Sequence, residues 1–204
     1  MNKKQGIIVV VSGPSGAGKG TVCKCLTDKN PGIFLSVSAT SRQQAEGEID
    51  GQTYYYLTEE DFKARIKNNE FLEWATYNGN YYGTLKEKVE NQTAQGNDVI
   101  LEIDVQGAMQ IKKTYPHAVL VFILPPSWQE LEKRLIDRNR EDMEQIQKRL
   151  ETARKEIPFA DKYNYIIVND DLETATKELE SVITAEKVKA QSCKNIVEQF
   201  KNNI

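Results

Sequence analysis

The chain has 204 residues and a formal net charge of −3 at pH 7. This length suits one domain with a full core, or such a core with small inserts. The charge excludes a general electrostatic attraction to nucleic acid or to an acidic membrane. The N-terminal residues pass into the first apolar run without a signal-like segment, and no apolar run approaches a membrane span in length. We therefore expect a cytoplasmic protein with neither nucleic acid nor membrane as a partner.

The cysteines and the single histidine leave little material for thiol or histidine chemistry. Cys23, Cys25 and Cys193 form no CxxC pair, so free thiols are expected rather than a disulfide or a zinc site. His117 follows Tyr115-Pro116 and is expected in a turn. Catalysis by a histidine-activated nucleophile is therefore not expected.

A glycine-rich run follows the first predicted strand, Ile7–Ser12, and reads Gly13-Pro14-Ser15-Gly16-Ala17-Gly18-Lys19-Gly20-Thr21. Glycines at this spacing let successive backbone N–H groups converge on phosphate oxygens, and the helix that follows adds its positive dipole end. Lys19 is expected to reach the β- and γ-phosphates. Gly20 stands where the P-loop pattern has Ser or Thr, so Thr21 is the hydroxyl left for Mg²⁺ or the α-phosphate. An ordinary strand-to-helix turn needs fewer glycines, so the run predicts a nucleotide-binding loop.

Apolar runs of strand length alternate with helical patterns along the rest of the chain, which predicts βαβ units and a mainly parallel sheet. The last predicted helix has an apolar stripe at Leu179, Val182 and Ile183 that is expected to pack along the core. Further strands are expected at Leu35–Val37, Val99–Ile103, Val119–Leu124 and Tyr165–Val168. Helices are expected to start at Gly18, Gly107, Trp128, Asp142 and Leu172.

Two stretches interrupt this alternation and look like inserts. Residues 38–90 are rich in Tyr, Glu and Gly, with short strands expected around Thr53–Leu57 and Tyr77–Gly83. Residues 127–152 form two charged helical segments that meet near residues 138–141. In the second stretch Arg134 and Arg138 are four residues apart and share a helix face. Arg149 lies on the following helix, whose apolar side is formed by Ile146, Leu150 and Ala153. By themselves these arginines also fit a solvated charged face.

The first insert contains polar groups that suit a second nucleotide. An arginine and phenolic hydroxyls match the needs of a phosphate group. A glutamate between aromatics accepts the paired N1 and N2 donors of guanine, whereas adenine presents an acceptor at N1. Singly, the tyrosines also fit a hairpin packing layer and Glu73 a helix-surface carboxylate. Together, beside a phosphate loop, they predict a second nucleotide pocket.

From the glycine-rich loop to about residue 188, the chain resembles the guanylate kinase family. The strings Gly-Asn-Tyr-Tyr-Gly-Thr and Ile-Asp-Val-Gln-Gly are specific to that family among P-loop kinases. The resemblance lies in Gly13–Thr21, Ser36–Arg42, Gly47–Tyr54, Asn69–Ala75, Gly79–Thr84, Ile103–Gly107, Pro125–Ser127 and Ile167–Asp171.

The resemblance implies an α/β fold in three parts. A P-loop kinase core with a parallel five-stranded sheet flanked by helices is expected over residues 1–36, 91–126 and 153–204. A mixed α+β GMP-binding insert is expected over residues 37–90, and a helical lid over residues 127–152.

The resemblance also implies an activity, ATP + GMP ⇌ ADP + GDP, with dGMP as a second acceptor and Mg²⁺ accompanying ATP. It implies catalytic roles for Lys19, Arg42, Arg134, Arg138 and Arg149. It implies ATP binding by the loop residues Gly13, Pro14, Ser15, Gly16, Ala17, Gly18, Lys19, Gly20 and Thr21, and by Asn169. It implies GMP binding by Ser38, Arg42, Tyr54, Glu73, Tyr82, Thr84 and Asp104. Mg²⁺ is expected to be held through water and phosphates near Thr21 and Asp104, in a monomer or homodimer.

Two positions depart from the family pattern. Ala45 stands where a second phosphate-binding arginine is usual, and the loss of one such bond costs about 1.5–3 kcal/mol. Lys86 or Lys88 is a possible substitute for that cation. Asn139-Arg140 replaces the Gly-Thr usually found after Arg138. Two other functions therefore stay open, a kinase for another nucleoside monophosphate and a non-catalytic binding module of the same family.

Overall fold

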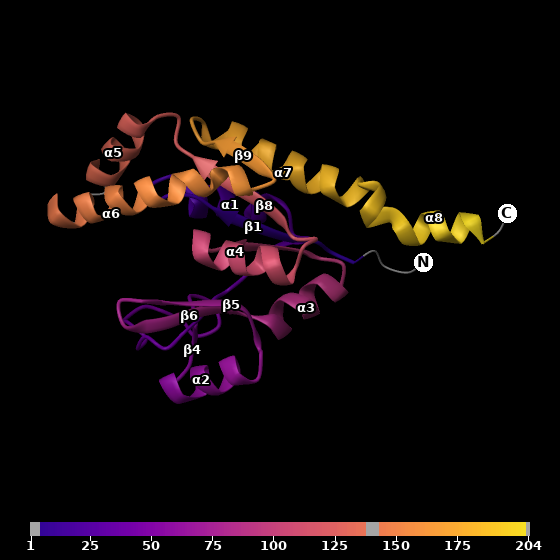
Figure 1. The fold of residues 1–204 in the computed structure, drawn as a ribbon, viewed down its shortest axis with the longest axis horizontal. Coiled ribbons are helices and arrows are strands. Elements are labelled where there is room, and N and C mark those ends of the chain that lie inside the picture. The colour runs from indigo at the N-terminus through magenta and orange to yellow at the C-terminus, as the bar shows by residue number, and fades with distance from the viewer. Residues whose placement is uncertain (1–4, 138–142, 203–204) are drawn as a thin grey trace.

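The computed structural model describes residues 5–137 and 143–202, and its centre is a five-stranded sheet (Figure 1). The strand order is β2-β7-β1-β8-β9, and each neighbouring pair is parallel. This arrangement confirms the predicted α/β fold with a parallel five-stranded sheet. The strands are β1 (Ile8–Ser12), β2 (Ile33–Leu35), β7 (Asp98–Glu102), β8 (Val119–Leu124) and β9 (Tyr165–Val168).

The edge strand β2 lies slightly earlier in the chain than predicted. The expectation of a strand at Leu35–Val37 is wrong, because the structure has it at Ile33–Leu35. It follows a turn in which the N–H of Ile33 donates to the carbonyl of Asn30 at 2.9 Å. Phe34 and Leu35 are partly exposed at this edge. No continuous buried run therefore marks the bounds of the strand in the sequence.

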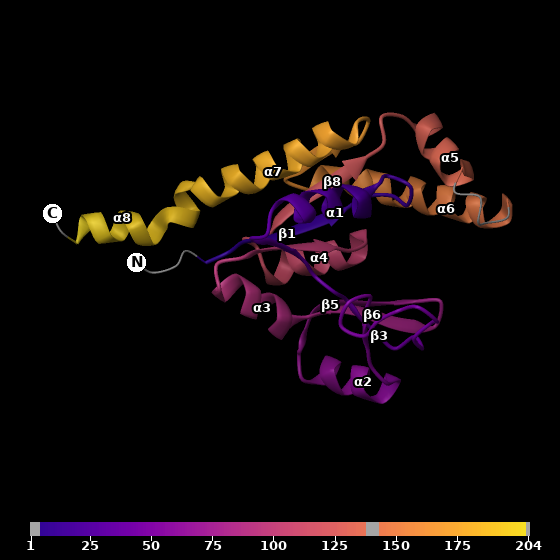
Figure 2. The same ribbon diagram turned by 180° about the vertical axis from the view of Figure 1, so that it is seen from behind.

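Helices cover both faces of the parallel sheet, α1 and α7 on one face and α3 and α4 on the other (Figures 1 and 2). The side chains of β1 alternate between the two layers: Val9 and Val11 pack with the first pair of helices, and Val10 with the second. All three valines are fully buried. The helices are α1 (Lys19–Lys29), α3 (Lys86–Ala94), α4 (Val105–Thr114) and α7 (Leu172–Val188).

The C-terminal region confirms the predicted apolar stripe. Leu179 and Ile183 of α7 are buried in the core, and Val182 packs against them. Beyond α7 the chain continues through η2 (Ala190–Cys193) and α8 (Lys194–Lys201). In both ribbon views α8 extends away from the sheet, on the side where the N-terminus lies.

A second, four-stranded sheet lies beneath α4 in Figure 1, with order β4-β3-β6-β5. Its small core is centred on Phe62 of α2, which stacks on Phe71 with ring centroids 4.3 Å apart. The sequence reasoning missed both α2 and α3, although Thr58 caps α2 by accepting the N–H of Asp61. The elements are β3 (Ala39–Thr40), β4 (Tyr55–Tyr56), α2 (Glu59–Lys67), β5 (Phe71–Tyr77) and β6 (Asn80–Leu85).

The strand expected around Tyr77–Gly83 is wrong, because the chain turns inside it. β5 ends at Tyr77 and β6 begins at Asn80, and the two strands pair antiparallel. Asn78 and Gly79, between them, have φ values of 48° and 78°. Asn-Gly is the pair that best tolerates two positive φ angles in a two-residue hairpin turn. The turn places residues 73 and 84 opposite each other across the hairpin.

The two charged segments form the helices α5 (Trp128–Asp137) and α6 (Met143–Glu156), followed by η1 (Ile157–Lys162). They share a small core of their own, which contains the apolar side predicted for α6. Its members are Leu131, Leu135, Ile146, Leu150 and Ala153, with Trp128 packed against them. Arg138 and the expected helix start at Asp142 lie outside the described residues.

Other expectations about local structure are met with small shifts. Helix α1 begins at Lys19 with Gly18 as its N-cap, and α4 begins at Val105, earlier than the predicted Gly107. Within the described residues the three cysteines form no disulfide, and His117 lies in a turn. Within the described parts of the chain, no helix combines the length and apolar composition needed to cross a membrane.

Candidate functional site

The glycine-rich loop connects β1 to α1 at the carboxyl edge of the parallel sheet. Gly13, Gly16 and Gly18 have φ values of 145°, 90° and 87°. At Gly13 a side chain is also excluded by space, because a Cβ atom there would lie 2.1 Å from the carbonyl oxygen of Ile123. The backbone of this loop therefore needs glycine, and it leads straight into the N-terminus of a helix, where an anion is favoured.

Lys19 lies folded over the loop that it follows. Its Nζ donates hydrogen bonds to the carbonyl oxygens of Gly13 at 2.7 Å and Pro14 at 3.2 Å. Packing favours glycine at residue 20 as well, because a Cβ atom there would lie 3.2 Å from Oε2 of Glu102, at the end of β7. The departure from the P-loop pattern at residue 20 thus leaves room for a carboxylate beside the loop.

A pocket of about 330 Å³ lies beside the loop. Asn169 closes one side of it: its Nδ2 donates to the carbonyl oxygen of Ala17 at 2.8 Å, and its backbone N–H donates to that of Leu124 at 2.7 Å. The structure therefore brings together loop residues, an arginine of α5 and the predicted Asn169. The lining is formed by Gly16, Gly18, Thr21, Arg134, Asp137, Asn169 and Leu172.

Two of the predicted arginines of the charged helices are described. Nη1 of Arg149 donates to the hydroxyl of Ser15 at 3.2 Å, which joins α6 directly to the loop. Nε of Arg134 pairs with Glu130, one turn earlier in α5, at 2.8 Å. Arg134 thus lines the pocket beside the loop, and Arg149 contacts the loop itself.

Glu73 and Thr84 form a buried pair in the second sheet. They face each other across β5 and β6, and the Thr84 hydroxyl donates to Oε1 of Glu73 at 2.6 Å. Glu73 is 6% exposed and Thr84 fully buried. Burial raises the pKa of Glu73, the hydrogen bond from Thr84 lowers it and the nearby negative charge of Asp104 raises it, with a net pKa of about 7. The alternative of a helix-surface carboxylate is therefore wrong for Glu73.

Asp104 lies between the second sheet and the loop. It is the N-cap of α4, where its Oδ1 accepts the N–H of Gly107 at 2.8 Å. Glu156 lies at the end of α6. Burial raises its pKa, the positive charge of Lys19 lowers it and the negative charge of Asp104 raises it. Glu156 is thus close enough to Lys19 and Asp104 to be affected by their charges, and Glu73 is close enough to be affected by that of Asp104. Sequence reasoning missed Glu156, since no motif marks it.

Arg42, Tyr54 and Tyr82 form a third group. The Arg42 guanidinium carbon lies 5.5 Å from the centroid of the Tyr54 ring, and the Tyr54 and Tyr82 centroids are 5.9 Å apart. Glu48, which sequence reasoning also missed, accepts Nη2 of Arg42 at 2.7 and 3.0 Å and the N–H of Ala45 at 2.8 Å. The hydrogen bond from Arg42 lowers the pKa of Glu48 to about 2.

Ser38, the remaining predicted residue of the insert, directly precedes β3. It is half-buried, and its carbonyl oxygen accepts the N–H of Tyr55 at 2.9 Å. The strand that it precedes pairs with β6, which carries Thr84. The structure thus keeps Ser38 in the same small sheet as the buried pair.

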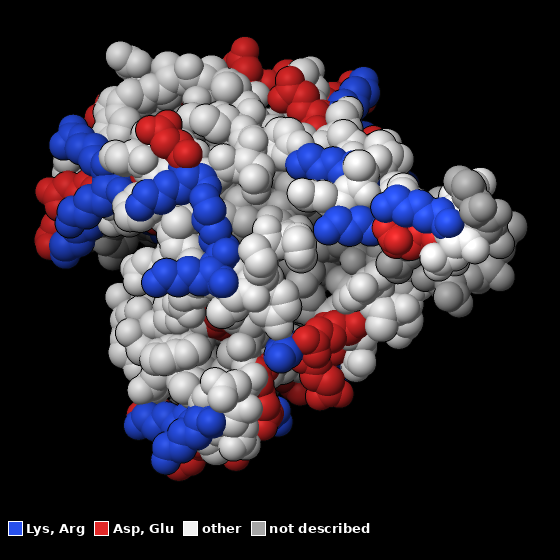
Figure 3. Space-filling view, turned by 45° about the vertical axis from the view of Figure 1, so that its right-hand side comes forward, with Lys and Arg blue, Asp and Glu red and all other residues white. Residues whose placement is uncertain are grey.

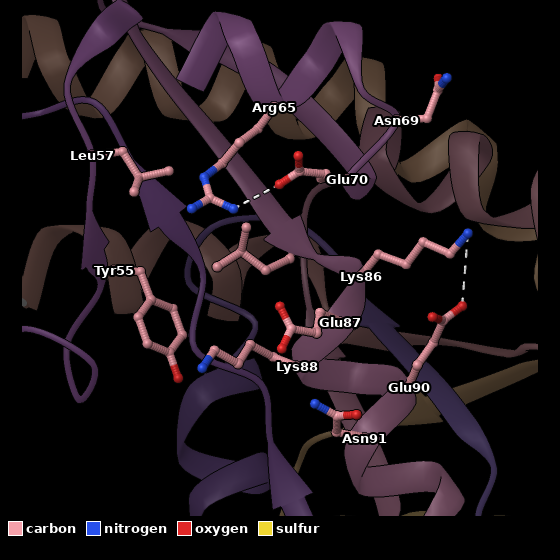
Figure 4. A pocket seen from close by; sticks show the side chains of 11 residues that line it. Tyr55, Leu57, Arg65, Asn69, Glu70, Lys86, Glu87, Lys88, Glu90 and Asn91 are labelled. Atoms are coloured by element: carbon pink, nitrogen blue, oxygen red, sulfur yellow. Dashed lines mark hydrogen bonds and ion pairs between the residues drawn. The ribbon is translucent and has the colours of Figure 1, made fainter. Parts of the chain in front are cut away.

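The two lysines considered as substitutes at residue 45 lie in a different pocket, of about 500 Å³ (Figure 4). There Lys86 pairs with Glu90 at 3.7 Å, and Nζ of Lys88 lies 5.2 Å from the centroid of the Tyr55 ring. Arg42 instead packs on the ring of Tyr56, at 5.9 Å, and successive strand residues point to opposite faces. In this structure neither lysine accompanies Arg42.

The surface in Figure 3 carries both signs of charge. Lys and Arg side chains form one larger group on the left of this face and smaller groups on the right and at the bottom, Asp and Glu side chains lie at the top, at the left edge and below the centre, and uncharged residues separate the groups. Neither sign forms a continuous field on the face shown.

A parallel sheet whose first strand feeds a glycine-rich loop and a helix, with a lysine folded over the loop, defines the class of P-loop nucleotide-binding proteins. The family model for guanylate kinase matches residues 5–186. Guanylate kinase of Carboxydothermus hydrogenoformans is 56% identical over 185 residues, which cover 91% of each chain. That of Clostridium perfringens is 49% identical over 203 residues, covering 97% of this chain and 94% of the other. The chain belongs to the guanylate kinase family.

A solved structure agrees with this assignment. The crystal structure of guanylate kinase from Anaplasma phagocytophilum matches with a TM-score of 0.73 at 33% sequence identity. The match covers 93% of this chain and 90% of the other, so the likeness extends over nearly the whole fold.

Proposed function

We propose that this protein transfers the γ-phosphoryl group of ATP to GMP, giving ADP and GDP. The observation that carries the proposal is the combination of an intact P-loop with the buried Glu73–Thr84 pair in the same chain. Membership of the guanylate kinase family supports the same reaction. dGMP, which keeps the guanine base, is proposed as a second acceptor.

The acceptor roles follow from the chemistry of guanine. The Glu73 carboxylate accepts N1–H and N2–H from guanine, with Thr84, Ser38 and Asp104 completing the polar surroundings of the base. Adenine presents an acceptor at N1, which an ionised Glu73 repels, so AMP is expected to be rejected. The GMP phosphate is assigned to Arg42, Tyr54 and Tyr82, the three side chains that pack together in the insert.

The donor roles follow from the loop pocket. Backbone N–H groups of residues 13–21 and Nζ of Lys19 bind the ATP phosphates, which replace the carbonyl oxygens that Lys19 contacts in this structure. Asn169, which lines the pocket beside the loop, is assigned to the adenosine part of ATP. Arg134 and Arg149 are assigned to the transferred phosphate, and so is Arg138, which lies outside the described residues.

Catalysis is proposed to proceed without a covalent intermediate. A phosphate oxygen of GMP attacks the γ-phosphorus in line with the departing ADP oxygen, and Lys19 with the arginines neutralises charge on the transferred group. Closure of the lid and the insert excludes water, which limits hydrolysis of ATP.

Mg²⁺ is proposed to accompany ATP. Mg²⁺ usually keeps several waters and takes few protein ligands, all oxygens. The Thr21 hydroxyl in the pocket wall, the Glu102 carboxylate beside Gly20 and the Asp104 carboxylate are oxygens of that kind. When bound, the ion adds positive charge at the β- and γ-phosphates. The proposed location in the cytoplasm and a monomeric or homodimeric state stay predictions from the sequence.

A coupled assay of ADP release with ATP, Mg²⁺ and GMP tests the proposal. Turnover is expected with GMP and not with AMP or pyrimidine monophosphates. Preference for AMP overturns the acceptor assignment, and absence of turnover with every monophosphate favours the non-catalytic module, for which Ala45 is the one supporting feature. Lys19→Ala is expected to lower kcat by about 10²-fold or more, because a cation on the transferred charge is lost. Full activity of that variant contradicts the role of the loop.

A further inference from the structure

Helix α4 of the core is joined to the second sheet through the side chain of Gln110. Its Nε2 donates to the carbonyl oxygen of Trp74 at 2.8 Å, and its Oε1 accepts the N–H of Trp74 at 3.2 Å. Strand β5 is the edge of its sheet, so among the described residues the outward backbone N–H and carbonyl of Trp74 have no partner strand on that side. The Gln110 amide takes the place of a neighbouring strand and holds the backbone directly after Glu73.

Gly107, one turn earlier on the same helix, lies directly against the Glu73 carboxylate. A Cβ atom at residue 107 would lie 2.6 Å from Oε2 of Glu73 and 3.2 Å from its Cδ. The other oxygen, Oε1, is already held by Thr84 at 2.6 Å. The carboxylate is thus confined between β6 and the bare backbone of α4. It cannot move away from a new side chain without disturbing its bond to Thr84.

Helix α4 itself is rigidly placed on the core. Ala108 and Ile111 are fully buried and pack with Leu101 and Leu120 of the parallel sheet. The face of α4 that carries Gly107 and Gln110 therefore has a fixed position relative to the P-loop core. The Glu73 carboxylate and the Trp74 backbone, which contact this face, are therefore positioned relative to the P-loop core as well.

We propose that Gly107 and Gln110 are positioning residues that aim the Glu73 carboxylate at the guanine base and so determine selectivity for GMP. The proposal rests on the proposed function, since it assigns these residues to the acceptor half of the same site. Gly107 supplies the space that the carboxylate needs, and Gln110 fixes the strand that carries it. Neither residue contacts the phosphates or the reacting atoms.

Gly107→Ala tests the role of space. Alanine is the better helix former, so the helix is not weakened by the change. We expect KM for GMP and its Kd by calorimetry to rise about ten-fold, since one charge-assisted contact is misaligned. KM for ATP is expected to stay unchanged, and the melting temperature to fall only slightly, because the better helix propensity of alanine offsets part of the strain at the buried carboxylate. Gly32→Ala is the matched control, because no atom lies within 4 Å of a Cβ atom there.

Gln110→Met tests the amide, because Met has a similar length and no hydrogen-bonding amide. We expect the same selective rise in KM for GMP, with partial recovery in Gln110→Glu, whose carboxylate still accepts the N–H of Trp74. Gln191→Met, at an exposed position far along the chain, is the matched control. A general loss of stability in Gln110→Met with equal changes in KM for ATP and GMP contradicts a positioning role.

A double-variant cycle shows whether Gly107 acts through Glu73. Glu73→Asp shortens the side chain and leaves room for a Cβ atom at residue 107. The combined variant is therefore expected to bind GMP more tightly than the sum of the two single effects predicts. Additive effects, or unchanged GMP affinity in Gly107→Ala, overturn the inference while wild-type GMP kinase activity persists. If the wild-type protein neither binds nor phosphorylates GMP, the proposed function fails instead.

Discussion

The Glu73 side chain is a buried carboxyl group whose ionisation is coupled to both folding and ligand binding. Its pKa is raised from 4.5 to about 7, first by burial and then by the charge of Asp104. A raised pKa means that the folded chain holds the proton more tightly than the unfolded chain does. The resulting contribution to stability is fully present below pH 4.5 and is lost as the pH rises through about 7. This loss corresponds to about 3 kcal/mol.

Binding of GMP is expected to release a proton from Glu73 below neutral pH. The N1–H and N2–H donors of guanine favour the ionised carboxylate, so they lower its pKa in the complex. At pH 6 we expect release approaching about one proton per GMP, and at pH 8 almost none. Calorimetry in buffers of different ionisation enthalpy measures the number directly. In Glu73→Gln the release at pH 6 is expected to disappear, and its persistence there would assign the proton to another group.

Ala45 is expected to be the position at which binding of the GMP phosphate is weakest. Its side chain is exposed, and its N–H is already bonded to Glu48, so a longer side chain fits without loss of packing. Ala45→Arg adds a second guanidinium group near Arg42 and is expected to lower the Kd for GMP about ten-fold. Calorimetric titration with GMP measures the change.

Lys88→Ala is the comparison for this substitution. Lys88 lies over Tyr55 in the other pocket, so its removal is expected to leave the Kd for GMP unchanged. A large loss of affinity in Lys88→Ala means that the lysine moves to the phosphate when GMP binds. In that case the chain already possesses the second cation.

Among the elements, the helix pair α5 and α6 depends on a small core of its own. Leu150 is 3% exposed and packs with Leu131, Leu135 and Ile146, separately from the cluster under the parallel sheet. Leu150→Ala is expected to destabilise this pair by about 2–5 kcal/mol. Arg149, the adjacent residue, then loses its defined approach to Ser15, and KM for ATP is expected to rise.

Hydrogen exchange and kinetics check this expectation together. Amide protection is expected to fall in α6 and to persist in β1 and β8, which lie in the main core. Val188→Ala removes an exposed side chain at the end of α7, 70% accessible, and serves as the control. Equal loss of protection throughout the protein would show that the helix pair and the sheet unfold as one unit.

At the scale of the whole molecule, the parallel sheet, the helix pair and the second sheet each contain apolar clusters among the described residues. The predicted ATP contacts lie on the first two and the predicted GMP phosphate contacts on the third. In-line transfer requires reacting atoms about 3–3.5 Å apart, so the parts are expected to approach one another when both nucleotides bind. The helix pair has a core of its own, so it can move without disrupting the packing of the parallel sheet, whereas β5 packs against α4 through the buried Leu72.

Small-angle X-ray scattering tests this closure. The radius of gyration is expected to decrease when GMP and a non-hydrolysable ATP analogue are both bound, and to change less with either alone. Identical scattering curves with and without both ligands contradict the expected closure and indicate that the unliganded protein already has the reactive arrangement.

Several features of the fold and site could be predicted because their signals are local. Patterns of only a few residues predict the buried strands β1, β7, β8 and β9 and the glycine-rich loop. Edge strand β2 and helix α2 were misplaced or missed, since half-exposed short elements have weak periodicity. The Asn78-Gly79 pair is a local signal for the hairpin turn, although the alternating pattern around it predicts a strand.

The sequence by itself determined the parallel-sheet class and the phosphate loop with Lys19, because glycine conformations and apolar periodicity act over short stretches. The family and its reaction were implied by the resemblance of several short residue strings. Only the tertiary structure decided that Glu48 holds Arg42, that Lys88 lies away from it, and that Gly107 and Gln110 confine Glu73. These contacts depend on strand register and on how α4 packs against β5. The physical reason is that such packing joins residues far apart in the chain, and no local pattern specifies which of them meet.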